Sequence, residues 1–174
     1  LGCNSLLDLI TFAYKVSLHI NGAKMSAPTK VSFANTEHIA ADLKKKWMSL
    51  FSKPAGEVEL LKENMKALMS KYVGIFRSDE QLKKAWQEIK IIEAEYQQIG
   101  IKDKSLKWNI EFQHYSELGN MIISSKATIC AAMWRCESRG AHWRVDYPNL
   151  SAAFSKHSIY NEEQAIIIAR DVRR

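Results

Sequence analysis

The sequence predicts a mainly α-helical fold: a helical bundle of about four to five helices with an irregular C-terminal tail and a short β segment. Helix breakers are scarce, with 7 Gly and 3 Pro among 174 residues. Apolar residues recur three and four positions apart over successive stretches, which is the period of a helix with one buried face. That period stops after residue 140, where the chain becomes polar and aromatic. The length suits one domain with a core of its own.

The first helix is expected at residues 4–20. Asn4 or Ser5 can accept the hydrogen bond that caps its start, and Gly22 suits the position just beyond its end. Apolar side chains cover most of its circumference, so we expect this helix to be buried on several sides. It is too short and too often interrupted by polar residues to predict a membrane span.

Four further helices are expected, each with one apolar stripe, and such stripes favour antiparallel packing in a bundle. Ser78 and Gln81 have the spacing of a capping box at the start of one of these helices. The stripes include Trp47 and Trp86, and Trp108 is also expected at a core position. The expected bounds are about residues 36–52, 57–72, 78–99 and 109–136.

The C-terminal tail has no helical period, and its β-branched run at residues 165–169 predicts a short strand. The chain therefore divides into four expected parts. They are the first helix (1–22), a linker with the first bundle helix (23–56), the helical domain (57–148) and the irregular tail with its strand (149–174).

Charge and cysteine content exclude several function classes. The net charge is +6, but Lys and Arg are dispersed, which favours a solvated surface or a face for an acidic protein over a nucleic-acid site. The cysteines Cys3, Cys130 and Cys136 are odd in number and lack CxxC spacing, so neither a disulfide framework nor a zinc site is expected. The sequence has no phosphate-binding glycine loop, no nucleophile elbow and no paired metal-binding histidines.

Residues 137–148 form the most unusual stretch, because charges of both signs stand beside Trp and Tyr. Arg139 and Arg144 can fork onto Glu137 and Asp146, which predicts a hydrogen-bonded and partly buried network. His142 and Tyr147 belong to the same stretch. The network could hold an interface together or form a site, and Glu137 with His142 could form an acid/base pair. Arginine stacking on tryptophan inside a folded corner is favoured over stacking on a nucleic-acid base. The residues expected in the network are Glu137, Arg139, His142, Arg144, Asp146 and Tyr147.

Five segments spread over the whole chain carry a family resemblance. They are LGCNSLLDL (1–9), MSKYVGIFR (69–77), SELGNMI (116–122), ESRGAHWRVDYP (137–148) and KHSIY (156–160). In this order they resemble segments of the flavoprotein subunit of succinate dehydrogenase and fumarate reductase, whose patterns include RLGxNSLLDL and ESRGAHxRxDYP. L-aspartate oxidases share the ESRG part but usually lack its continuation, so His142, Arg144 and Asp146 favour the dehydrogenase and reductase branch.

The resemblance implies a C-terminal portion of a FAD-dependent enzyme, whose other domains bind FAD and close over a dicarboxylate. The helix at 1–22 would return to the FAD domain with its N-terminus towards the cofactor. Position by position, Asn4, Ser5 and Leu6 match cofactor-binding residues. Cys3 matches a residue near the substrate carboxylate, where the family more often has Ala or Ser. The family's catalytic and remaining binding residues would lie upstream, so we expect no catalytic residue, no metal ligand and no bound FAD in these 174 residues alone.

The whole enzyme, by this resemblance, interconverts succinate and fumarate by hydride transfer at FAD and passes electrons to an iron–sulfur subunit. The 137–148 stretch would tie the bundle to the FAD domain or to that subunit. Membrane contact would be indirect, through anchor subunits, with the protein peripheral on the cytoplasmic side of a bacterial inner membrane or on the mitochondrial matrix side. The alternatives are a separate helical subunit of a split enzyme, an interaction module, or the C-terminus of an L-aspartate oxidase.

Overall fold

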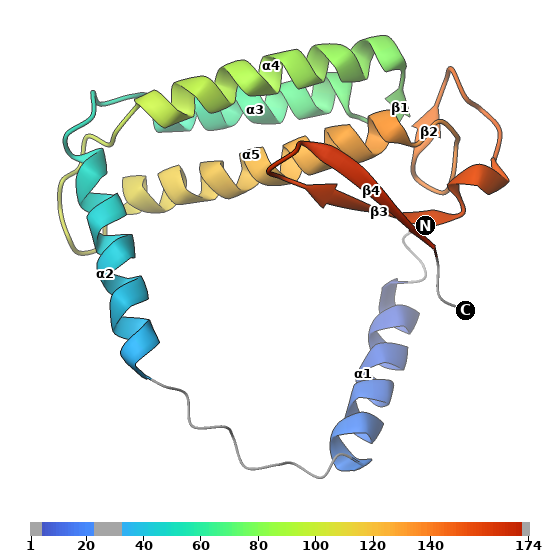
Figure 1. Ribbon diagram of the computed structural model, residues 1–174, viewed down its shortest axis with the longest axis horizontal. Helices are drawn as coiled ribbons and strands as arrows, with labels where there is room; N and C mark the ends of the chain where they lie inside the picture. Colours follow the sequence, from blue (N-terminus) through green and yellow to red (C-terminus); the bar gives the residue numbers. More distant parts are fainter. Residues whose placement is uncertain (1–4, 23–32, 172–174) are drawn as a thin grey trace. The chain divides into compact units, whose positions relative to one another are not determined.

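A computed structural model describes the backbone of residues 5–22 and 33–171, and the side chains of residues 6–22 and 36–171 (Figure 1). The chain divides into two compact units, residues 1–41 and residues 42–174. The described part contains five α-helices and two small β-sheets, so the expected mainly α-helical class is confirmed. The helices are α1 (Ser5–Gly22), α2 (Phe33–Leu50), α3 (Val58–Tyr72), α4 (Asp79–Gln98) and α5 (Ile110–Trp134).

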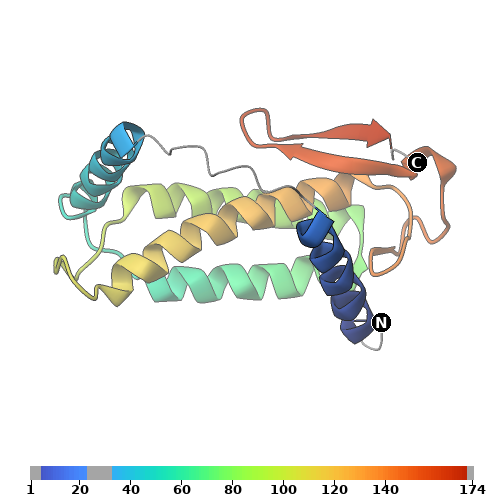
Figure 2. The ribbon, with the colours of Figure 1, turned by 90° about the horizontal axis from the view of Figure 1, so that it is seen from below.

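The second unit is built on the bundle of α3, α4 and α5, whose ribbons run side by side in both views (Figures 1 and 2). Every apolar stripe of this bundle faces the same core, as the helical spacing requires. Trp47 at the end of α2 stacks on Phe112 of α5, with ring centroids 4.3 Å apart. The buried core comprises Leu50, Val58, Leu61, Met65, Leu68, Val73, Leu82, Ala85, Ile89, Ile92, Ile101, Tyr115, Leu118, Ile122, Ile129 and Ala132.

Local sequence signals fix the helix starts. The Ser78 hydroxyl accepts a hydrogen bond from the Gln81 backbone at 3.3 Å, so the predicted cap of α4 is confirmed. The Asn109 side chain accepts from the Phe112 backbone at 2.7 Å and caps α5. Gly119 lets α4 and α5 approach closely, because a Cβ there would lie 2.4 Å from the Tyr96 hydroxyl oxygen.

Two small sheets follow the bundle. β1 (Phe76–Arg77) pairs in parallel with β2 (Trp143–Arg144), so Phe76 lies beside Trp143. β3 (Lys156–Asn161) and β4 (Ile166–Asp171) form an antiparallel hairpin that packs along α5 (Figure 2). A short 3-10 turn at Ala152–Phe154 precedes the hairpin.

The predicted strand at residues 165–169 is confirmed as part of β4, but its partner β3 was not predicted. Strands β1 and β2 have two residues each, too few for any periodic signal. The prediction of Trp108 as a core residue is wrong, since its side chain is 96 % exposed in the α4–α5 loop. The apolar side chains of α1 are also exposed, and their burial against a partner stays a prediction.

Candidate functional site

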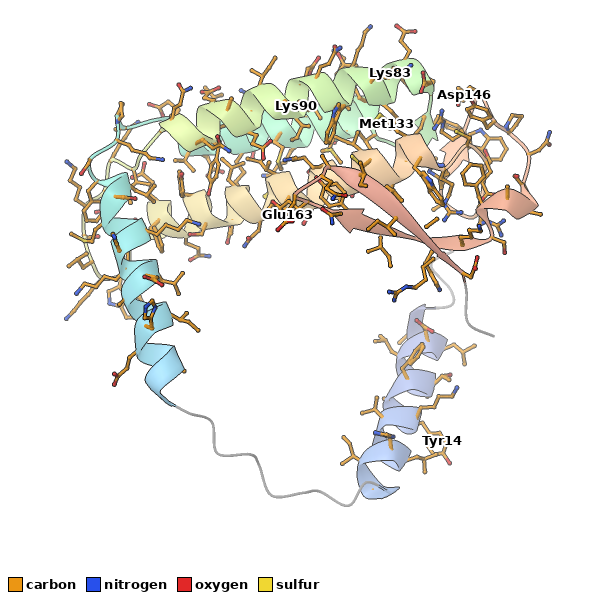
Figure 3. All side chains as sticks on the ribbon, in the orientation of Figure 1. Tyr14, Lys83, Lys90, Met133, Asp146 and Glu163 are labelled. Carbon is orange, nitrogen blue, oxygen red and sulfur yellow. The ribbon has the colours of Figure 1, made fainter. Side chains whose placement is uncertain are left out.

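The unusual stretch at residues 137–148 leaves the end of α5 and returns beside β1, at one end of the bundle. Figure 3 shows its side chains gathered around the labelled Asp146, next to Met133 of α5 and Lys83 of α4. Glu137 pairs with Arg139 and Asp146 pairs with Arg144, as predicted, and His142 contacts Arg77. The elements that meet at this corner are separated widely in sequence, so the network joins the start of α4 to the end of α5.

Glu137 is fully buried and accepts four hydrogen bonds. Arg139 donates from Nε at 2.8 Å and from Nη2 at 3.1 Å, and Arg135 donates from Nη1 at 2.7 Å. The backbone N–H of Ser151 donates the fourth at 2.8 Å. The Arg139 hydrogen bond is the main cause that lowers the pKa of Glu137 from 4.5 to about 2. Glu137 is therefore a charged structural anchor.

Arg144 is the second anchor and is also fully buried. Its Nε and Nη2 donate to the two carboxylate oxygens of Asp146 at 2.8 and 2.7 Å, and its Nη1 donates to the Ala132 carbonyl at 2.7 Å. Asp146 also accepts from the backbone N–H of Asp79, the first residue of α4, at 2.9 Å. The Arg144 hydrogen bond lowers the pKa of Asp146 from 3.8 to about 2. This charged pair therefore binds the last turn of α5 to the first turn of α4.

His142 links Arg77 of β1 to Arg135 at the end of α5. Its Nδ1 lies 2.9 Å from Nη1 of Arg77, and its Nε2 lies 3.0 Å from the Arg135 carbonyl oxygen. A guanidinium can only donate and a carbonyl can only accept, so the imidazole is neutral with its hydrogen on Nε2. Burial lowers its pKa, and the nearby arginines act in the same direction.

The acid/base alternative does not fit this geometry. Within the described side chains, Glu137 and His142 share no hydrogen bond, because each is engaged elsewhere. The favoured arginine stacking is observed. The guanidinium carbon of Arg135 lies 5.2 Å from the centroid of the Trp134 ring, and that of Arg144 lies 5.0 Å from the centroid of the Tyr147 ring. The stretch thus has the chemistry of a rigid structural joint.

The joint presents an apolar outer surface, which we call the apolar corner. In and after β2, Arg144 is buried, while Trp143, Val145 and Tyr147 are exposed. Phe76 lies opposite Trp143 in the parallel pair and is 66 % exposed. The apolar corner comprises Ile75, Phe76, Trp143, Val145 and Tyr147. Several exposed apolar side chains on neighbouring segments of a rigid frame suit a protein–protein contact.

Most of the residues predicted to lie near the cofactor and substrate are outside the described part of the chain. Cys3 and Asn4 lie outside the described residues, and only the backbone of Ser5 is described, as the first residue of α1. Leu6 is described and exposed. Among the described residues, no group of His, Cys, Asp and Glu could hold a metal ion.

Three members of the joint were not predicted from sequence: Arg77, Arg135 and the Asp79 backbone. Arg77 lies in a segment that the resemblance already included, but nothing in the sequence showed that it meets His142, 65 positions away. Arg135 stands two residues before Glu137 and could have been found by the same charge pairing that identified Arg139.

Comparisons with known proteins agree on one family. The profile described as "Fumarate reductase flavoprotein C-term" matches residues 62–173. The succinate dehydrogenase flavoprotein subunit of Coxiella burnetii is 34% identical over 164 residues, covering 92% of this chain and 27% of that protein. The 8-methylmenaquinol:fumarate reductase flavoprotein subunit of Wolinella succinogenes is 33% identical over 167 residues, covering 91% of this chain and 26% of that protein.

Solved structures share the fold. An E. coli quinol fumarate reductase chain superposes with a TM-score of 0.74 at 24% identity, covering 83% of this chain and 26% of that chain. The chain thus spans about a quarter of the length of the proteins it matches. With the family profile matching well over half of its residues, the chain belongs to the family formed by the C-terminal portion of succinate dehydrogenase and fumarate reductase flavoprotein subunits.

Proposed function

We propose that this chain works as the C-terminal helical domain of a FAD-dependent enzyme that interconverts succinate and fumarate. The observation that carries the proposal is the family match over residues 62–173, joined to relatives of both names that match nearly all of the chain. In such an enzyme, bound FAD supplies the hydride chemistry, and electrons pass on to an iron–sulfur subunit.

The start of α1 fits a position near FAD or the dicarboxylate. The helix begins at Ser5, so the N–H groups of its first turn have no acceptor within the helix. Such groups, with the positive end of the helix dipole, favour an anionic flavin or a substrate carboxylate. In this proposal Asn4, Ser5 and Leu6 contact the cofactor, and the backbone of Cys3 lies near the substrate.

The joint at residues 137–148 has a positioning role in this proposal. Its buried ion pairs hold the apolar corner rigid, so that the bundle docks in one orientation on the FAD-binding part or on the iron–sulfur subunit. Neither anchor carboxylate is available for proton transfer, because both are held as anions by arginine. The chain by itself is therefore expected to bind no FAD and to catalyse nothing.

The proposed membrane association is peripheral and runs through other subunits. No helix in the described parts of the chain has the length and apolar character that crossing a membrane requires. The surface on which the enzyme would act is the cytoplasmic side of a bacterial inner membrane or the mitochondrial matrix side.

The proposal is tested by attaching an affinity tag after Arg174 in the source cell and purifying the tagged protein. Flavin absorbance, polypeptide mass, succinate-dependent dye reduction and fumarate-dependent oxidation of a reduced viologen are then measured. We expect a longer, flavin-containing polypeptide active with both dicarboxylates, while the 174-residue chain made alone shows neither flavin nor activity. Recovery of a flavin-free 19.9-kDa polypeptide would favour a separate helical subunit and contradict the proposal.

A further inference from the structure

The loop between α4 and α5 presents an exposed tryptophan. Trp108 is 96 % exposed, more than any other large apolar side chain that the structure describes. Leu106 and Ile110 flank it at 54 % and 64 % exposure. The loop lies at the end of the bundle opposite to β1 and β2, far from the apolar corner (Figure 1). We call Leu106, Trp108 and Ile110 the apolar tip.

The backbone at Trp108 is strained. Its φ of +56° lies in the left-handed region, which costs a bulky side chain free energy that glycine would not incur. Such strain persists only where the surroundings hold the backbone in place, and it is concentrated at functional positions. A tryptophan that is both strained and fully exposed contributes little to the fold of the unit that carries it.

A hydrogen-bond network holds the loop in this shape. The Asn109 amide donates to the carbonyls of Asp103 and Ser105 at 2.8 and 3.0 Å, while its oxygen caps α5. The Glu111 carboxylate accepts from the backbone N–H of Asp103 at 2.7 Å. The tip is thus held ready before any partner arrives, which lowers the entropy that binding would cost.

Two free cations stand beside the tip. The amines of Lys104 and Lys107 have no ion-pair partner among the described residues, whereas Lys102 pairs with Glu57. The carboxylates of Asp103 and Glu111 accept hydrogen bonds from backbone N–H groups and form no ion pair with Lys104 or Lys107. A surface that receives the tip would therefore combine an apolar pocket for the indole with carboxylates on its rim.

We propose that the apolar tip is a second docking point, at which Trp108 enters an acid-rimmed apolar pocket on the remainder of the flavoprotein polypeptide. This inference rests on the proposed function. It commits to that occupant because the matched relatives extend over nearly four times the length covered by this chain. Docking at the tip and at the apolar corner would hold the bundle at both ends.

Photocrosslinking tests the occupant directly. A benzophenone amino acid replaces Trp108 in the tagged flavoprotein, which is irradiated, digested and analysed by mass spectrometry. We expect a cross-link to a segment of the same polypeptide outside these 174 residues that contains apolar residues and Asp or Glu. The matched control carries the benzophenone at the exposed Glu163, in the turn between β3 and β4 (Figure 3), and should give no such cross-link.

A cross-link to another subunit, to lipid or to a second copy would overturn the proposal, as would none at all. If the tagged protein contains no flavin, the proposed function fails. If flavin is present and the cross-link is absent, only the docking point fails. The two failures are therefore distinguishable.

Trp108→Gly gives a second test, because it should stabilise the 174-residue chain and destabilise the flavoprotein. The glycine relieves the strained φ, so the 174-residue chain should melt at a higher temperature than the unchanged chain. The flavoprotein should instead release flavin at a lower temperature, because it loses the anchor. Shifts of the same sign in both proteins would contradict a docking role for Trp108.

Discussion

At the scale of single residues, the defining feature is two buried charges, Glu137 and Arg144, each held by its own partner of opposite charge. Glu137 and Arg144 are both fully buried, which is tolerable only because every charged group has a close partner. The Glu137 and Asp146 carboxyls have a lower pKa in the folded state, to about 2 for each, so they stabilise the fold above their ordinary pKa values. That contribution is lost progressively as the pH falls from about 4.5 towards 2.

Glu137→Gln should destabilise the chain strongly, although it changes the side-chain volume little. The substitution removes the buried anion and leaves the mostly buried Arg135 without a charged partner, so we expect a loss of about 3 kcal/mol in the free energy of unfolding. Urea denaturation at pH 7 measures it. Glu63→Gln is the matched control, because Glu63 pairs with Lys66 on the exposed face of α3 and should have no measurable effect. Equal losses for both variants would contradict the role of burial.

His142 should stay neutral below the pH at which an ordinary histidine takes up a proton. Burial and the neighbouring arginines lower its pKa from 6.5, so the imidazole takes up a proton less readily in the folded state than in the unfolded state. The folded state then binds fewer protons than the unfolded state, and stability falls as the pH drops below 6.5. Nitrogen-15 NMR of the imidazole measures both the tautomer and the titration. We expect the hydrogen on Nε2, and a midpoint at or above 6.5 would contradict the assignment.

Sequence reasoning predicted the pairing of these charges but not their partners across the fold. Arg139 with Glu137 and Arg144 with Asp146 are two residues apart, and side chains so close in an extended segment can be paired from chemistry alone. Arg77 with His142 is a tertiary contact, set by how α4 and α5 pack, so no local pattern contained it.

At the scale of elements, close helix packing depends on one glycine. Gly119 on α5 faces Tyr96 on α4, whose ring stacks on Tyr115 at 4.4 Å. The two tyrosines fill the space between the helices, and the Tyr115 hydroxyl donates to the Tyr96 carbonyl at 3.1 Å. The absence of a side chain at Gly119 is therefore part of the packing.

Gly119→Ala should destabilise the bundle by about 2 kcal/mol, even though alanine is the better helix former. Its Cβ would lie 2.4 Å from the Tyr96 hydroxyl oxygen and 3.0 Å from the ring carbon that carries it. Thermal unfolding of the chain measures the loss. Combining it with Tyr96→Phe removes the nearer clash, so the double variant should recover part of the stability. No recovery would show that the clash does not involve the hydroxyl.

Elements were predictable where their signal is periodic. The apolar stripes gave α3, α4 and α5 within about two residues, since long helices repeat their pattern several times. The hairpin partner β3 is short and mostly polar, so its strand character comes from its pairing with β4 and from packing against α5. Trp108 was expected in the core, but it precedes the Asn109 cap of α5 and is exposed.

At the scale of the whole molecule, both ends of the bundle expose apolar side chains. The apolar corner and the apolar tip lie at opposite ends of the bundle, and neither is needed for the core between them (Figures 1 and 3). The relatives are about four times as long as this chain, and in the proposed function the rest of such a flavoprotein would cover both surfaces.

Phe76→Ser combined with Trp143→Ser should separate folding from docking. Phe76 is 66 % exposed and Trp143 43 % exposed, and neither belongs to the core, so the melting temperature of the 174-residue chain should fall only slightly. The tagged flavoprotein should instead lose flavin at a lower temperature, because its corner contact is weakened. Ile91→Ser, at an exposed position of α4, is the control for removing surface apolar area. Equal flavin loss in the control would contradict a specific role for the corner.

The pairing of β1 with β2 also has a kinetic consequence. The two strands are 67 positions apart in sequence and enclose the whole of α4 and α5 between them. Closing so long a loop is entropically costly until the helices have packed, whereas contacts between neighbouring helices form early. The joint should therefore form late in folding and open early in unfolding, so that damage to it acts mainly by shortening the lifetime of the folded state.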